Sequence, residues 1–100
     1  MSRDDRIVEQ IRSEFRDEAR DRYATLQIDY ANLRSMATPD RETLRSVVQS
    51  AEKVQYCARS AEAMALYLAI KRMITFFELD SDTIPRHYAD IDTLFDILDQ

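Results

Sequence analysis

Hydrophobic side chains recur every three or four residues along most of this chain, a period that predicts amphipathic α-helices. The longest such stretch covers residues 38 to 77; it opens with Thr38-Pro39-Asp40 and then contains neither proline nor glycine. We expect one face of this stretch to pack against a core. That face is formed by Leu44, Val47, Val48, Ala51, Val54, Ala58, Ala61, Ala65, Leu68, Ala69, Met73 and Phe76.

The sequence leaves open whether this stretch forms one helix or two. Residues 55 to 62 include no helix breaker, so a single helix could continue to Phe77. Ser60 belongs to a residue type that favours helix N-termini, so a bend between Tyr56 and Ser60 could start a new helix at Ala61. Met64, Met73, Phe76 and Phe77 then fall at helical spacing, which is typical of core residues.

A first helix is predicted to begin at Ser2, because serine readily caps the open amides of a helix N-terminus. The break at residues 35 to 40 ends this helix, since Pro39 disfavours helical geometry at Thr38. Either Thr38 or Asp40 could cap the next helix, and so short a connection implies antiparallel helices. From Ala19 onward, spacing of four and three suits a helical bundle. The apolar stripe of this first helix is Ile7, Val8, Ile11, Phe15, Ala19, Tyr23, Leu26, Tyr30 and Leu33.

A last helix is predicted after residues 80 to 82, which are all good capping residues, with Pro85 in its first turn. The apolar face of this helix contains Ile84, Tyr88, Ile91, Leu94, Phe95 and Leu98. The chain is therefore predicted to be all-α: an antiparallel bundle of three to four helices that forms one domain over residues 1–100.

Composition narrows the classes of function. The chain has no glycine, which excludes the glycine-rich turns of dinucleotide and phosphate loops. Nineteen acidic residues against fourteen basic ones give a net charge of −5, which disfavours nucleic acid and anionic lipid as partners. The longest apolar-rich stretch, Ala61 to Ile70, contains Glu62 and is too short to span a membrane. We therefore expect a cytoplasmic protein, in which the single Cys57 is a small core or interface thiol.

No residue pattern points to catalysis. His87 is the only histidine, so one chain cannot supply a Ser-His-Asp triad or a two-histidine metal site. Glu14 and Glu18 lie one turn apart, but the Glu-x-x-His pattern of di-iron bundles is missing. The sequence thus predicts a protein that is not an enzyme and that has no cofactor and no metal site.

A row of arginines marks another face of the first helix. Arg12, Arg16 and Arg20 are spaced four residues apart, and such a row could meet an acidic partner. Glu9 and Asp17, together with Asp21, are close enough in sequence to pair with it. The row is therefore interpreted as a solvated charged face.

The layout resembles a histidine-containing phosphotransfer domain, in particular the P1 domain of chemotaxis kinases. Phe15-Arg16-Asp17-Glu18-Ala19 matches the Phe-x-x-Glu-Ala beginning of that family. Residues 40 to 51 match the helix that leads to the phosphorylated histidine, and residues 82 to 98 resemble the last helix. The resemblance implies a helical bundle that takes part in two-component signalling and phosphorelay.

The phosphorylated site itself differs. The family has a histidine followed by a lysine and a glycine three and four residues later, and Glu52, Gln55 and Tyr56 stand at these positions. Since glutamate cannot form a phosphoramidate, the resemblance implies a pseudo-phosphotransfer module that docks a receiver or histidine-kinase domain. The expected partner-binding residues share the helix face opposite Val47 and Ala51. They are Arg45, Gln49, Glu52, Gln55, Tyr56 and Arg59.

A second hypothesis is a dimeric helical-hairpin adaptor, or a small inhibitor protein that binds a larger complex. It requires an unbroken helix from about residue 40 to 77. The alanine row of that helix, which includes Ala58, Ala61, Ala65 and Ala69, would pack against a second copy and form a homodimer.

Overall fold

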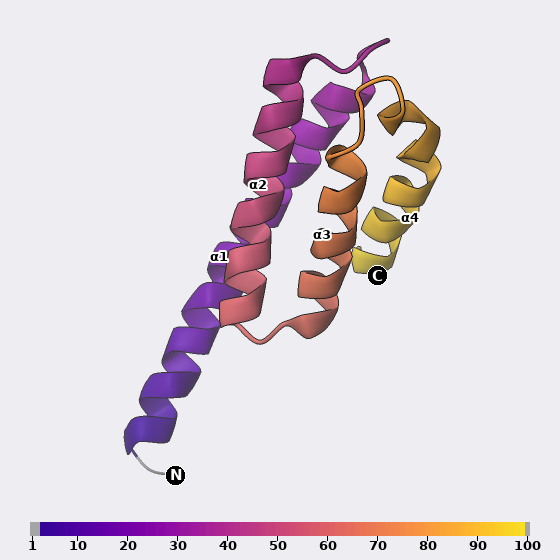
Figure 1. Cartoon of the computed structure of the whole chain (residues 1–100). Helices are drawn as coiled ribbons and strands as arrows, with labels where there is room; N and C mark the ends of the chain where they lie inside the picture. The colour runs from indigo at the N-terminus through magenta and orange to yellow at the C-terminus, as the bar shows by residue number, and fades with distance from the viewer. Residues whose placement is uncertain (1–2, 100) are drawn as a thin grey trace.

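The computed structural model describes residues 3–99, which form four α-helices and one short 3-10 helix (Figure 1). Successive α-helices run in opposite directions, so the predicted all-α antiparallel bundle is confirmed, with four helices (Figure 1). The proposed cap Ser2 lies outside the described residues. The elements are α1 (Arg3–Arg34), α2 (Arg41–Ser60), α3 (Met64–Phe77), η1 (Ile84–His87) and α4 (Tyr88–Leu98).

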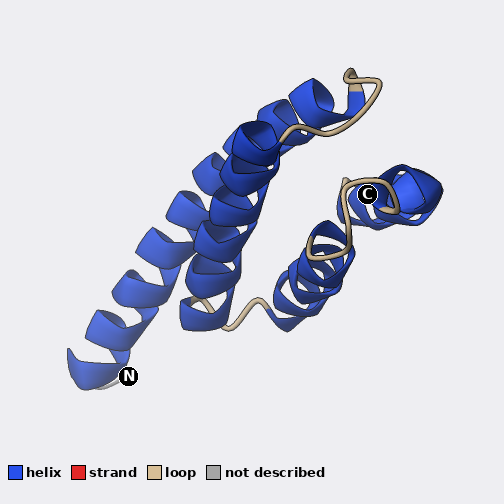
Figure 2. Ribbon diagram, turned by 45° about the horizontal axis from the view of Figure 1, so that its top comes forward, coloured by secondary structure: helices blue, strands red, loops and turns tan. Residues whose placement is uncertain are grey.

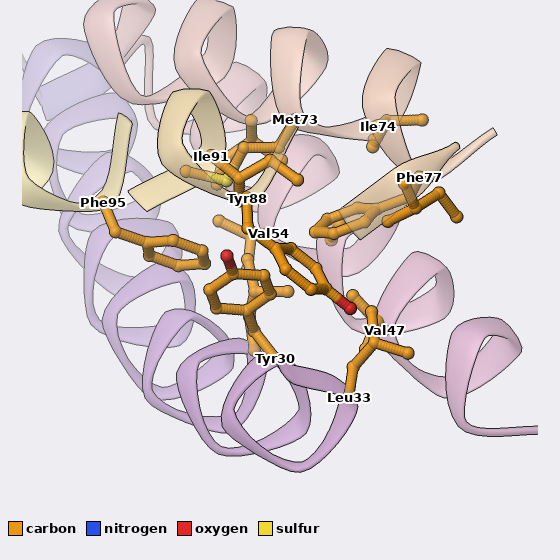
Figure 3. Close-up of a cluster of buried hydrophobic side chains, with 14 residues drawn as sticks. Tyr30, Leu33, Val47, Val54, Met73, Ile74, Phe77, Tyr88, Ile91 and Phe95 are labelled. Carbon is orange, nitrogen blue, oxygen red and sulfur yellow. The ribbon is translucent and has the colours of Figure 1, made fainter. Parts of the chain in front are cut away.

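The helices are arranged as two pairs. The helices α1 and α2 lie side by side as a long hairpin, and α3 and α4 cover one side of it (Figure 2). The core fills the space between the pairs, and Figure 3 shows its aromatic centre. Its buried members are Leu26, Tyr30, Leu33, Val47, Ala51, Val54, Ile70, Met73, Ile74, Phe77, Ile84, Tyr88, Ile91 and Phe95.

The helix α1 is much longer than its neighbours, with 32 residues against 20 in α2. Its N-terminal turns extend past the end of α2 (Figure 1), and residues 3 to 11 are all exposed. The prediction that Ile7, Val8 and Ile11 face a core is therefore wrong, because no helix of the described chain reaches them. This extension makes the molecule elongated, with a longest dimension of 54 Å.

The long second stretch is divided into α2 and α3 by a turn at residues 61 to 63. Glu62 has a left-handed backbone, with φ at 59°. The amide of Ala63 donates to the carbonyl of Ala58 at 2.8 Å and the amide of Glu62 to that of Arg59 at 3.1 Å. This pair of bonds is the Schellman motif, which ends a helix. The bend therefore lies just beyond the predicted interval from Tyr56 to Ser60.

This turn has two consequences for the sequence predictions. Ser60 does not cap α3, which begins after Ala63 without any side-chain cap. The unbroken helix that the hairpin-dimer hypothesis required is contradicted. Its alanine row is also partly occupied, since Ala58 and Ala61 are buried within their own chain.

The other helix ends are formed in two different ways. Asp40 caps α2, because its carboxylate accepts a hydrogen bond from the Thr43 amide at 2.6 Å. That bond also lowers the pKa of Asp40 below its ordinary value. The last helix is reached through η1, which contains Pro85 in its first turn and has no side-chain cap. The capping role predicted for residues 80 to 82 is therefore wrong.

Part of the predicted core face of α3 is exposed. Met64 and Leu68 are 52% and 57% exposed, and Ala65 is exposed as well, whereas Met73 and Phe77 are buried. The reason is geometric: α3 packs on α2 and α4, and its first turns extend beyond the end of α4 (Figure 1).

Candidate functional site

An open groove with a volume of about 870 Å³ lies between α1 and α2. The helix α2 contributes to this groove from the face opposite its buried residues Val47, Ala51 and Val54. The groove therefore lies on two rigid helices and not on loops. The residues that line it, here called the α1–α2 groove, are Glu14, Phe15, Glu18, Arg22, Gln49, Glu52, Lys53, Tyr56 and Cys57.

Two aromatic rings form the apolar part of the groove. The rings of Phe15 and Tyr56 meet edge to face, with centroids 6.2 Å apart and an interplanar angle of 75°. Phe15 is half-buried, but Tyr56 is 66% exposed. Edge-to-face packing of this kind restricts the tyrosine side chain without removing it from solvent. Tyr56 is thus held in place and available for contact.

Charged side chains surround the aromatic pair. The Nε of Arg22 donates to Glu18 at 2.8 Å, one helical turn apart on α1. Glu14 lies on the same helix, and Glu52 and Lys53 come from α2. The lining thus contains three acids and two bases. Such a mixed pattern fixes the register in which a partner binds, and it does not simply attract a partner of one charge.

Cys57 lies at the inner side of the groove and is buried. Burial raises the pKa of its thiol, and the nearby Glu18 raises that pKa further while Arg22 lowers it. A thiol with a raised pKa stays protonated at neutral pH, and it is the thiolate that attacks electrophiles. The predicted role as a small core or interface thiol agrees with this environment.

The structure separates the six predicted partner-binding residues into two groups. Gln49, Glu52 and Tyr56 line the α1–α2 groove, and all three are exposed. The other three lie on α2 outside the groove lining: Arg45 and Arg59 are exposed and Gln55 is half-buried. Three of the six predicted partner-binding residues thus lie together at one site.

Sequence reasoning missed the contribution of α1 to the groove, because Phe15 was placed in the core stripe. Each four-residue step advances 400° around a helix, so it rotates the stripe by about 40° relative to the previous residue. Phe15 and Ile11 therefore turn progressively away from the seam that Ala19 begins. The change from alternating steps to repeated fours was the signal that could have revealed this.

Within residues 3–99 no group of three or more His, Cys, Asp and Glu side chains is arranged to hold a metal ion. The Nδ1 of His87 lies 3.4 Å from Asp90, and the ring stacks on Phe76 with centroids 5.1 Å apart. This histidine is therefore half-buried beside the last helix and packs as an ordinary side chain.

Comparisons with protein-family models, curated proteins and solved structures find no match for this chain. The resemblance to phosphotransfer domains therefore rests on the residues quoted above. Among the described residues, no helix combines the length and the apolar character needed to cross a membrane.

Proposed function

We propose that this chain is a non-catalytic protein-interaction module of bacterial-type signalling, which docks a receiver or histidine-kinase domain through the α1–α2 groove. One observation carries the proposal: Tyr56 is 66% exposed and is held by Phe15 in the α1–α2 groove. The resemblance of three segments to phosphotransfer domains supplies the class of partner. A cytoplasmic location is part of the same proposal.

The aromatic pair has the properties of an interface anchor. Tyrosine is enriched among the residues that dominate binding energy, because it combines a large apolar ring with a polar end and few rotatable bonds. An open groove between two helices suits a partner that inserts an apolar side chain beside Tyr56 and Phe15. The surrounding Glu14, Glu52 and Lys53 would then select the register of that partner.

Glu52 explains why the proposal excludes phosphate transfer. It occupies the position of the phosphorylated histidine in the family that the chain resembles, and its carboxylate cannot form the phosphoramidate. Glu52 instead presents a fixed negative charge on the rim of the groove. Docking by this module would therefore not depend on phosphorylation of its own chain.

The proposal is tested by affinity capture from lysate of the source cells, with partners identified by mass spectrometry. Three baits are compared: the unchanged chain, Tyr56→Ala, and Arg45→Ala as a matched control from the same helix outside the groove. We expect a receiver or histidine-kinase protein with the unchanged chain and with Arg45→Ala, and its loss with Tyr56→Ala. Capture of an unrelated complex that is indifferent to Tyr56 would overturn the assignment.

A further inference from the structure

A second cleft opens where α4 ends. The C-terminus of α4 lies beside the middle of the bundle, whereas α1 and α3 both continue past it (Figure 1). A cleft of about 610 Å³ lies between α1 and α3 beside this end of α4. We call this the α1–α3 cleft; its lining includes Arg16, Arg20, Met64, Ala65, Ala69 and Ile97.

The cleft exposes apolar surface. Met64 and Ile97 are 52% and 57% exposed, and both line the cleft. Ala65 and Ala69 lie one turn apart on α3 and leave room for close approach of another backbone. A helix whose apolar side chains rest on these four residues would remove from water Met64 and Ala65, which belong to the predicted core face of α3 and are left exposed by its own chain.

The charge of the cleft is opposite to that of the whole protein. Two arginines, Arg16 and Arg20, belong to its lining, and no acidic residue does. Arg16 donates to the exposed Glu9 at 2.6 Å, and no ion pair is found for Arg20 among residues 3–99. Positive charge on a protein whose net charge is −5 marks a local preference for an acidic ligand.

We propose that the α1–α3 cleft binds an acidic amphipathic helix of a partner protein. The helix lies along α1 and α3, with apolar side chains on Met64 and Ile97 and carboxylates at Arg16 and Arg20. Arginine binds carboxylates strongly because its planar guanidinium offers two parallel donors. From Arg16 to Tyr23 the cleft follows α1 for about 10 Å, which corresponds to roughly two helical turns of the partner.

This binding mode is separate from the proposed function. The α1–α2 groove uses Phe15, Glu18 and Arg22 of α1, whereas the α1–α3 cleft uses Arg16 and Arg20 from another side of the same helix. One surface can therefore be lost by substitution while the other is kept, and each proposal can fail alone.

The test uses a display library of helical peptides, selected for binding to the complete chain. Each peptide has about four helical turns, fixed leucines at helical spacing, and Asp, Glu, Lys, Arg or Ser at the other positions. We expect selected peptides to be acidic. For one such peptide, the double change Arg16→Glu and Arg20→Glu should raise the dissociation constant by about tenfold or more, because two charge-assisted contacts become repulsive.

The matched control carries Arg41→Glu and Arg45→Glu, which change the net charge equally on an exposed part of α2 outside the cleft. It should alter the dissociation constant by less than about twofold. Peptide binding should also shift the NMR signal of the Met64 methyl group. Selection of neutral or basic peptides, equal weakening by both double variants, or loss of binding with Tyr56→Ala would overturn the proposal.

Discussion

The ring of Tyr30 packs against three other aromatic rings, with centroids 6.0 Å from Phe77 and Tyr88 and 4.9 Å from Phe95. Its hydroxyl donates a hydrogen bond to Asp92 at 2.7 Å. Tyr88 packs in the same cluster (Figure 3), but its buried hydroxyl has no hydrogen-bond partner within residues 3–99. The two tyrosines therefore have the same kind of ring environment and opposite polar environments.

This contrast predicts different responses to removal of the hydroxyl. Tyr30→Phe should lower the free energy of unfolding by about 1–2 kcal/mol, because a hydrogen bond to a carboxylate is lost. Tyr88→Phe should leave that free energy unchanged or raise it, because the lost hydroxyl had no partner. Urea unfolding followed by circular dichroism measures both variants. An equal loss in the two variants would contradict the contact pattern around these rings.

Tyrosine ionisation predicts how stability depends on alkaline pH. Burial raises the pKa of Tyr30 and of Tyr23, and hydrogen bonds to Asp92 and Asp99 raise them further. The unfolded chain then loses these protons first, at a pH of about 10. Their contribution to stability is complete below this pH and decreases as the pH rises above it.

We therefore expect the urea midpoint to fall between about pH 9 and pH 11. Tyr30→Phe should show a smaller fall, since one of the groups responsible has been removed. A midpoint that is constant over this interval, or a fall that Tyr30→Phe does not reduce, would show that these hydroxyls are not held in their protonated form.

At the scale of elements, the sequence predicted the start of α2 better than its end. Asp40 was one of the two predicted caps, and it does cap α2. It could be predicted because a short acidic side chain after Pro39 marks a helix start in the local sequence. The end of α2 had no such signal. Its left-handed residue is Glu62, in a chain without glycine, so the turn is formed by backbone bonds that any residue type can make.

The left-handed conformation of Glu62 should cost stability. The left-handed conformation costs a residue with a Cβ about 1–2 kcal/mol. Glycine avoids this cost, but it loses more backbone entropy on folding, which costs about 0.5–1 kcal/mol. Glu62→Gly should therefore raise the free energy of unfolding by about 0.5–1 kcal/mol relative to Glu62→Ala. Both variants lose the exposed Arg12–Glu62 ion pair, 3.0 Å long, so this loss cancels. Urea unfolding that finds the alanine variant equally stable would contradict this account of the turn.

At the scale of the whole molecule, periodicity predicted the bundle but not which apolar positions a neighbour covers. Ile11 in α1 and Leu68 in α3 follow helical spacing, yet both are exposed. Whether such positions are covered depends on the lengths and directions of the other helices. The apolar stripe of one helix gives no information about these. The same limit applies to the candidate site, since Tyr56 was predicted from α2 alone and its partner Phe15 comes from α1.

The helix α1 connects the two proposed binding surfaces. It lines the α1–α2 groove on one side and the α1–α3 cleft on another, and it also contributes Leu26, Tyr30 and Leu33 to the core. Two different partners could therefore occupy a single rigid scaffold.

Docking through the α1–α2 groove is measured most directly by the dissociation constant of a receiver or histidine-kinase domain from the source organism, determined by calorimetry. The comparison uses the unchanged chain, Tyr56→Ala and Arg45→Ala, each shown to be folded by circular dichroism. We expect Tyr56→Ala to weaken binding by about thirtyfold or more, which is equivalent to a hot-spot loss of about 2 kcal/mol. Arg45→Ala should change the dissociation constant by less than about twofold. Absence of binding by the unchanged chain, or equal affinities of the two variants, would contradict docking through this groove.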